Sequence, residues 1–112
     1  VTHVKGWKDI RETDRGLLWE HLVLDMLRIS CGRIFYWTDK DKNEIDFIIK
    51  GSGNDVHTIE CKINPEKYSS KAVQKFRNYY PSGRNYCFSP HIKAPFKLKV
   101  SKLEVEFRST FI

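Results

Sequence analysis

The sequence predicts an α/β fold with a mixed central sheet flanked by helices and extended by edge strands at the C-terminus. Apolar and polar residues alternate over 44–50 and 56–63, on either side of the turn-forming residues 51–55. A largely apolar segment of helical length precedes this hairpin, and a second helix followed by a strand comes after it. Consecutive hairpins combined with one crossover helix give a mixed sheet with a helix on each side.

The first helix is predicted over about residues 15–30, with Asp14 as its N-cap and Cys31-Gly32 at its end. Polar residues form one stripe, and the remaining circumference is apolar, so we expect a largely buried helix. The stripe contains His21, Asp25 and Arg28, and the apolar residues are Leu17, Leu18, Leu22, Val23, Leu24, Met26, Leu27 and Ile29. Residues 1–13 are mixed and polar and read as a linker or the tail of a preceding domain, which leaves 14–112 as the folded domain.

Residues 33–38 read as a strand, followed by a charged, solvated turn over 39–43. If the next hairpin closes symmetrically, residues whose numbers sum to 106 face each other. Asp46 then lies opposite Glu60, and Glu44 opposite Lys62. Simple alternation puts Asp46, Glu60 and Lys62 on one face and the apolar residues Ile45, Phe47, Ile59, Cys61 and Ile63 on the other.

Like charges directly opposite on a sheet repel, with Cβ atoms only ~5 Å apart. A divalent cation between Asp46 and Glu60 would turn that repulsion into binding. The alternative is a solvated face of scattered charges, and a register slip of one residue would separate the two acids.

Glu20 projects among the apolar side chains of the first helix rather than from its polar stripe. A carboxylate there is costly unless it has a partner. It is either an acid near the first turn, favoured by the helix dipole or reaching the rim, or a third carboxylate directed at the same edge of the sheet.

Asn64-Pro65 ends the third strand, and Ser69 or Ser70 can cap a second helix that runs to about Tyr80. Its predicted apolar stripe is Val73, Phe76 and Tyr80. Another face gathers Lys71, Gln74, Lys75 and Asn78, which either contact phosphates or face water. Residues 84–89 read as a central strand, and 96–112 as one or two edge strands with Lys97, Lys99, Lys102 and Arg108 on the solvent side.

Length, charge and cysteine content limit the kinds of protein that this chain can be. A length of 112 residues suits one domain. The 20 Lys and Arg against 14 Asp and Glu give a net charge of +6, which favours polyanionic partners. No apolar run approaches the ~20 residues of a membrane span. The widely spaced Cys31, Cys61 and Cys87 fit neither a disulfide framework nor a zinc site, so a reducing cytoplasm is expected. Since Met26 is the one methionine, we expect a domain cut from a longer protein.

The order αβββαβ, with an acid in the second strand and Glu60-Cys61-Lys62 in the third, resembles the PD-(D/E)XK nuclease superfamily, which has the restriction-endonuclease-like fold. Four segments more narrowly resemble the domain of unknown function at the C-terminus of prokaryotic AAA-type ATPases. They are Gly16-Leu17-Leu18-Trp19-Glu20, Glu44-Ile45-Asp46-Phe47, Ile59-Glu60-Cys61-Lys62 and the end of the second helix, 75–81. The resemblance covers roughly residues 14–90, and Ile45-Asp46 replaces the expected proline-aspartate pair.

The resemblance implies a metal-dependent DNA endonuclease domain that follows an ATPase domain in the same chain. Asp46 and Glu60 would bind Mg²⁺ or Mn²⁺, Glu20 would be a further metal ligand and catalytic acid, and Lys62 would be the catalytic lysine. The second-helix residues Lys71, Gln74 and Lys75 would contact the nucleic acid. The alternative is a non-catalytic module of that ATPase, which binds DNA or a protein and serves a regulatory role.

Overall fold

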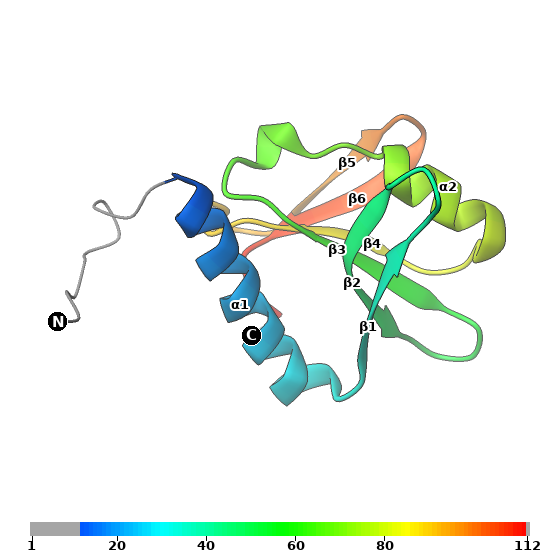
Figure 1. Ribbon diagram of the computed structural model, residues 1–112, viewed down its shortest axis with the longest axis horizontal. Helices are drawn as coiled ribbons and strands as arrows, with labels where there is room; N and C mark the ends of the chain where they lie inside the picture. The colour runs from blue at the N-terminus through cyan, green and yellow to red at the C-terminus, as the bar shows by residue number, and fades with distance from the viewer. Residues whose placement is uncertain (1–11, 112) are drawn as a thin grey trace, which may run out of the picture.

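The computed structural model describes residues 12–111 and contains a six-stranded sheet with one long helix on one face and a shorter helix on the other (Figure 1). The elements are α1 (Glu12–Cys31), β1 (Ile34–Thr38), β2 (Glu44–Lys50), β3 (Val56–Cys61), the 3₁₀ turn η2 (Pro65–Lys67), α2 (Lys71–Tyr79), β4 (Asn85–Phe88), β5 (Phe96–Val100) and β6 (Leu103–Arg108). The strand order is β1-β2-β3-β4-β6-β5, with β4 parallel to both of its neighbours and the other pairs antiparallel. The predicted mixed α/β architecture is confirmed.

The β2–β3 hairpin has the predicted register from Phe47 to Lys50, but the pairing ends there, so the predicted pairs Asp46–Glu60 and Glu44–Lys62 do not form. Phe47 lies opposite Ile59 and Lys50 opposite Val56, as the sum of 106 requires. The turn closes with a hydrogen bond from the N–H of Gly51 to the carbonyl of Asp55, at 2.8 Å. Gly53 adopts a left-handed φ of 59° there, which glycine accepts without strain.

The simple alternation expected along β2 is wrong at its N-terminal half, because the strand contains a bulge. Phe35 of β1 pairs with Ile48 but Trp37 pairs with Ile45, so three steps along β2 match two along β1. Ile45 therefore packs with Val73 on the α2 side of the sheet, not with Phe47 on the α1 side as predicted. Asp46, the first of the two expected acids, and Phe47 are the two residues of β2 that lie opposite the single residue Tyr36 in this bulge.

Each face of the sheet has its own hydrophobic core. On the α1 side the buried residues are Val23, Leu27, Phe47, Ile49, Ile59, Tyr86 and Phe88. On the α2 side they are Ile45, Ile48, Val73 and Phe76, continued towards β6 by Cys87, Ile92, Val105 and Phe107. All four residues of β4 are buried, as predicted for a central strand.

Helix α1 is less buried than its sequence suggested. The helix begins at Glu12, so Asp14 lies within it and is not its N-cap. It ends as predicted before Gly32, which has a left-handed φ of 74°. The sheet covers one side of the helix only, the side that carries Val23 and Leu27. Apolar residues on the remaining circumference are exposed, namely Leu17, Leu18, Leu22 and Ile29.

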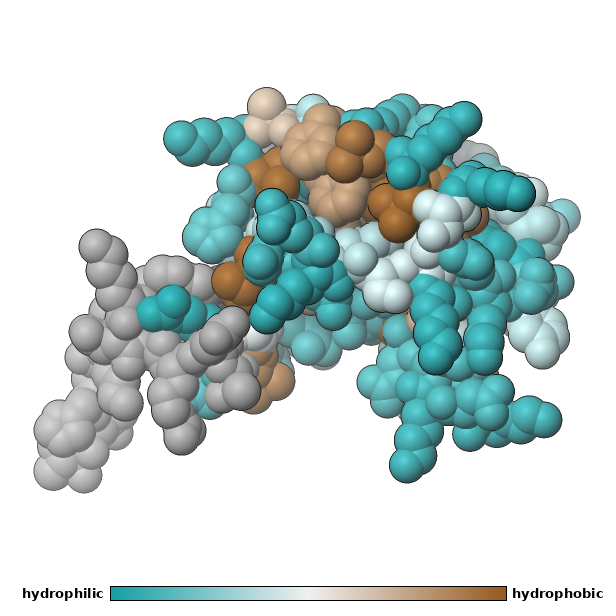
Figure 2. All heavy atoms as spheres, turned by 90° about the horizontal axis from the view of Figure 1, so that it is seen from above, coloured by the Kyte–Doolittle hydropathy of each residue, from teal (hydrophilic) through white to brown (hydrophobic). Residues whose placement is uncertain are grey.

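Helix α2 follows the prediction closely. Ser70 is its N-cap residue, Val73 and Phe76 are buried, and Tyr80 lies just past the end and is half exposed. Of the two C-terminal strands, β5 is at the edge while β6 lies inside, between β4 and β5. Figure 2 shows apolar side chains gathered over this hairpin, where Phe96 and Leu98 are exposed, and hydrophilic side chains around them.

Arg77 of α2 ties the helix to the ends of two strands. Its guanidinium donates to four backbone carbonyls and one side-chain oxygen at 2.8–3.1 Å. The acceptors are the carbonyls of Val56, Tyr80, Ser82 and Arg84 and the Oδ1 of Asn85. A planar group with donors on three nitrogens is needed to reach all of them.

We expect Arg77→Ala to lower the free energy of unfolding by about 3 kcal/mol, because it leaves several backbone carbonyls without a donor. Urea denaturation measures this loss. The matched control is Arg28→Ala, whose side chain is 66% exposed and whose removal should change stability by no more than ~0.5 kcal/mol. Equal effects of the two substitutions would contradict the proposed role of Arg77.

Candidate functional site

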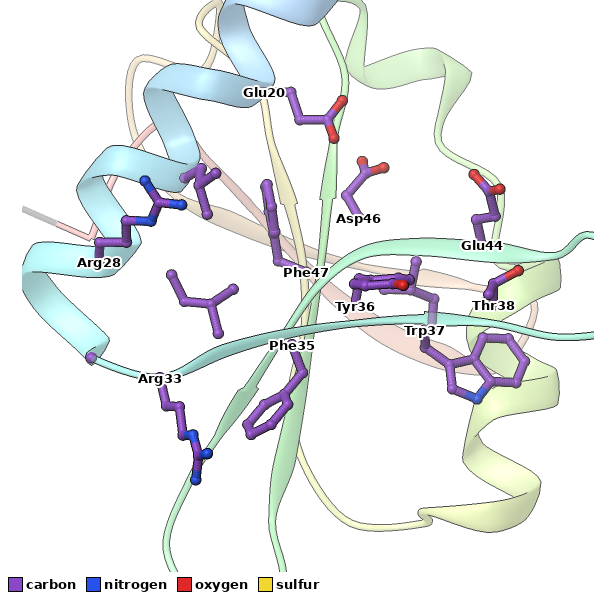
Figure 3. Close-up of a pocket in the computed structure, with 14 residues that line it drawn as sticks. Glu20, Arg28, Arg33, Phe35, Tyr36, Trp37, Thr38, Glu44, Asp46 and Phe47 are labelled. Carbon is purple, nitrogen blue, oxygen red and sulfur yellow. The ribbon is translucent and has the colours of Figure 1, made fainter.

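A groove of about 670 Å³ runs between α1 and the strands β1 and β2. Its lining includes the apolar residues Leu24, Ile34 and Phe47. At one end the carboxylates of Glu20, Asp46 and Glu44 lie on the same side of the groove, and Arg28 lies towards the other end (Figure 3). The groove therefore separates an acidic end from a basic one.

Asp46 occupies the bulge and takes the place of a backbone group. Its Oδ2 accepts a hydrogen bond from the backbone N–H of Cys61 at 2.8 Å, beyond the last backbone pair of β2 and β3, Phe47–Ile59. Burial raises the pKa of Asp46, while this hydrogen bond and the positive charge of Lys62 act in the opposite direction. The carboxylate is held where the two strands separate.

Glu60 is buried, with 8% of its surface exposed, and its Oε1 makes no hydrogen bond. Burial raises its pKa to about 8, and the nearby charge of Asp46 adds to this effect, whereas Lys62 opposes it. Asp46 and Glu60 are thus close enough to interact. A buried oxygen without a partner is costly, and indicates a site where a proton, a water molecule or a cation belongs.

The two acids do not share one face, contrary to the sequence-based expectation. Glu60 alternates with Ile59 and Cys61, which pack on the α1 side, so its side chain turns to the α2 side beside Cys87. Asp46 turns towards Glu20 on the α1 side (Figure 3). The bulge accounts for the difference, and the acids approach each other from either side of the separated strand ends.

Glu20 belongs to this group, and its neighbour Trp19 fixes its position. Burial raises the pKa of Glu20, and Asp46 is the next largest cause. The indole Nε1 of Trp19 donates to the carbonyl of Phe88 at 2.9 Å, and that carbonyl also accepts from the backbone N–H of Lys62 at 3.0 Å. The start of α1 is therefore held at the ends of β3 and β4, where Lys62 also lies.

The three predicted acids come together only in part. Glu20 and Asp46 line the groove together, whereas Glu60 and Lys62 lie behind it and do not line it. Within residues 12–111 no three His, Cys, Asp or Glu side chains are placed to hold a metal ion on their own. The sequence had not singled out Tyr36 of β1 or Arg28 as groove residues, because no motif marks them. The sequence predicted that Glu44 lies opposite Lys62, whereas in the structure Glu44 lines the groove.

The predicted nucleic-acid residues of α2 line a separate polar cavity of about 480 Å³. It contains Ser69, Ser70, Lys71, Gln74, Lys75 and Asn78, together with Ser101 from the β5–β6 turn. The Nε2 of Gln74 donates to Ser70 Oγ at 2.7 Å, and the Nζ of Lys75 lies 3.6 Å from a carboxylate oxygen of Asp41. Lys71 is the most exposed cation of the group. The contribution of Ser101 had no signal in the sequence, because its turn lies in another part of the chain.

This mixed α/β domain, with acids gathered where two strands separate, can be placed in a family. Residues 15–102 match the family described as Domain of unknown function (DUF4143), and the chain belongs to that family. No curated protein matches the sequence. Among solved structures, a chain in the refined half-complex from a tetradecameric assembly of Thermococcus gammatolerans McrB AAA+ hexamers with bound McrC has a similar fold. The TM-score is 0.52 at 14% identity, over 87% of this chain but only 28% of that one.

Neither helix in the part of the chain that the structure describes combines the length and the apolar character required to cross a lipid bilayer. This agrees with the absence of a long apolar run in the sequence. The predicted linker over residues 1–13 lies almost entirely outside the described residues.

The raised pKa of Glu60 predicts that stability falls as pH rises. The folded state keeps the proton up to pH about 8, whereas the unfolded chain releases it near 4.5. The stabilisation is therefore complete below pH 4.5 and is lost as pH rises through 8, by up to about 1.4 kcal/mol per pH unit. Urea unfolding across this range measures the slope.

Glu60→Gln should reduce that slope but not abolish it, because the pKa values of Asp46 and Glu20 are raised as well. Glu66→Gln, a change at an exposed carboxylate of η2, is the control and should leave the slope as it is. An identical slope in wild type and Glu60→Gln would show that Glu60 does not carry the effect.

Proposed function

We propose that this chain is a metal-dependent nuclease domain that hydrolyses phosphodiester bonds in DNA. One observation carries the proposal: the buried Glu60, with an oxygen that has no partner, interacts with Asp46 beside Lys62 where β2 and β3 separate. Burial raises the pKa values of both acids, and the negative charge of Asp46 raises that of Glu60 further, although Lys62 acts in the opposite direction.

The residues fit Mg²⁺ or Mn²⁺. Mg²⁺ is commonly held by one or two carboxylates, with water and substrate phosphate completing its coordination. Asp46 and Glu60 would supply these two groups from either side of the separated strand ends, and Glu20 would be a further ligand on the groove side of Asp46. When bound, such an ion polarises a phosphoryl oxygen and lowers the pKa of a coordinated water.

The chain's own residues have distinct roles in this proposal. The N–H of Cys61 fixes the orientation of Asp46, and Glu60 lies beside Cys87 of β4 and is influenced by the backbone of Asp46. Lys62, whose positive charge already acts on both acids, would orient the attacking water and offset negative charge that develops on the phosphate. On the α2 surface, Lys71, Gln74 and Lys75 would contact the backbone of the nucleic acid.

We further infer that the domain works beside an ATPase domain of the AAA type in the same chain. The fold of this chain recurs in a structure of AAA+ hexamers with bound McrC, and there it matches 28% of a longer chain. Together with the family match over residues 15–102, this supports a module that accompanies a motor.

Incubation of the 112-residue chain with supercoiled plasmid and Mg²⁺ or Mn²⁺ tests the activity. We expect nicking that Asp46→Asn and Lys62→Met each reduce by at least about a hundredfold. Either ion should also raise the melting temperature of the wild type by binding the folded state, and Asp46→Asn should remove this shift. Asp25→Asn, at a 70% exposed carboxylate, is the control. Cleavage that persists in Asp46→Asn, or a wild type that neither cuts nor binds metal, would overturn the proposal.

A second candidate function is a binding module of the ATPase without catalysis. Two observations favour this function. Glu60 has a pKa of about 8, so it is largely protonated near neutral pH. The carboxylate of Asp46 already accepts a hydrogen bond from the backbone N–H of Cys61. In this case the polar cavity on α2 would bind DNA, and Asp46 and Glu60 would serve to hold the strand ends.

DNA binding in EDTA tests the role of the α2 surface independently of cleavage. DNA affinity falls as salt rises, and each neutralised phosphate adds about 0.9 to the steepness of log affinity against log salt. If Lys71 neutralises a phosphate, Lys71→Ala should therefore make this slope less steep by about 0.9. Lys97→Ala is the control, because the Nζ of Lys97 already lies 3.5 Å from a carboxylate oxygen of Glu104, and it should change the slope less. If the wild type shows no affinity for DNA in low salt, this surface serves another partner.

A further inference from the structure

The two edge strands of the sheet, β5 and β1, differ in how well they are protected against pairing with a strand of another chain. Strand β5 carries Lys97 and Lys99 and follows Pro95, and charges and proline at an edge discourage pairing with another chain. Strand β1 has the sequence Ile-Phe-Tyr-Trp-Thr, without a charge or a proline. Phe35 is 38% exposed and Tyr36 77% exposed. An apolar edge of this kind is open to a partner strand.

The outer edge of β1 presents backbone groups at three residues. The N–H of Asp39 donates inwards, to the carbonyl of Asn43 in the turn before β2, at 3.1 Å. Backbone groups alternate in direction along a strand that is paired antiparallel. Ile34, Tyr36 and Thr38 therefore direct their N–H and C=O groups away from the sheet, symmetrically about Tyr36.

The charges that flank β1 would pair with opposite charges if a second copy of β1 lay beside it in the antiparallel direction. Arg33 precedes the strand and Asp39 follows it, at equal distances from Tyr36. In an antiparallel pair of two such strands centred on Tyr36, Arg33 lies opposite the partner's Asp39 at both ends. Phe35 then lies opposite the partner's Trp37, an aromatic cross-strand pair of the type that stabilises sheets.

From these observations we propose that two copies of this chain associate through the outer edges of β1, in antiparallel register centred on Tyr36. The partner strand is a second copy because the sequence around Tyr36 complements itself in charge, in aromatic pairs and in backbone direction at once. The pair joins two six-stranded sheets into one continuous sheet with two-fold symmetry. Five-residue strands bury a small area, so association in the micromolar to millimolar range is expected.

Sedimentation velocity of the 112-residue chain from roughly 10 μM to 1 mM tests this association. We expect reversible dimers, and slower exchange of the amide hydrogens of Ile34, Tyr36 and Thr38 at high concentration. No metal or nucleic acid is present, so the result is independent of the proposed nuclease activity. A monomer throughout the range overturns the inference.

Variants at the centre of the strand identify the interface. Tyr36→Pro removes an outward N–H from both copies and should abolish the dimer. Tyr36→Lys places two like charges at the symmetry axis and should weaken it strongly without the risk of a backbone change. Circular dichroism should confirm that both variants fold, since Tyr36 is exposed. A dimer that persists in folded Tyr36→Lys protein overturns the β1 interface.

Charge reversal tests the register. Arg33→Glu puts two carboxylates opposite each other at both ends of the pair and should weaken the dimer roughly tenfold. Lys99→Glu is the matched control at the other edge of the sheet and should leave the dissociation constant unchanged. Equal effects of Arg33→Glu and Lys99→Glu would exclude this register in favour of a general charge effect.

Discussion

The hydrogen bond from the N–H of Cys61 to the carboxylate of Asp46 determines how the candidate site is built. It lies where the backbone pairing of β2 and β3 stops, and it allows the two strands to part without leaving that N–H unsatisfied. The bulge in β2 makes the contact possible, because it turns the Asp46 side chain out of simple alternation. Glu60 and Lys62 flank Cys61 at this junction, and Trp19 holds Glu20 nearby through the carbonyl of Phe88, which also accepts from the N–H of Lys62.

Each of the two cores supports one part of the site. The α1 core holds Glu20 and the groove, since Trp19 anchors that helix to the carbonyl of Phe88. The α2 side of the sheet holds Glu60, which is packed near Cys87 and Tyr68. The Tyr68 hydroxyl is also buried without a hydrogen bond, and burial, followed by the charge of Glu60, raises its pKa. The Glu60 carboxylate and the Tyr68 hydroxyl, each buried with an oxygen that makes no hydrogen bond, thus lie on the same side of the sheet.

The sequence predicted the order of elements and the register of the β2–β3 hairpin, because alternation and a five-residue turn are local signals. It did not predict the bulge at Asp46. A bulge depends on how β1 pairs with β2, and no residue in Glu44–Lys50 marks the extra step. The error then carried over to the expected common face of Asp46 and Glu60. Similarly, the burial of α1 was overestimated because an apolar circumference does not reveal how much of it a sheet covers.

The carboxylates of the site are mounted on opposite layers of the molecule, and this gives the domain a mechanical property. Glu20 is carried by α1 and Asp46 by β2, whereas Glu60 of β3 lies on the α2 side of the sheet, where its charge acts on Tyr68. The sheet between them is thin, so a small tilt of either layer alters the spacing of the acids. A change in the packing of α1 against the sheet would therefore alter the spacing of Glu20 and Asp46, while Glu60 lies on the other face.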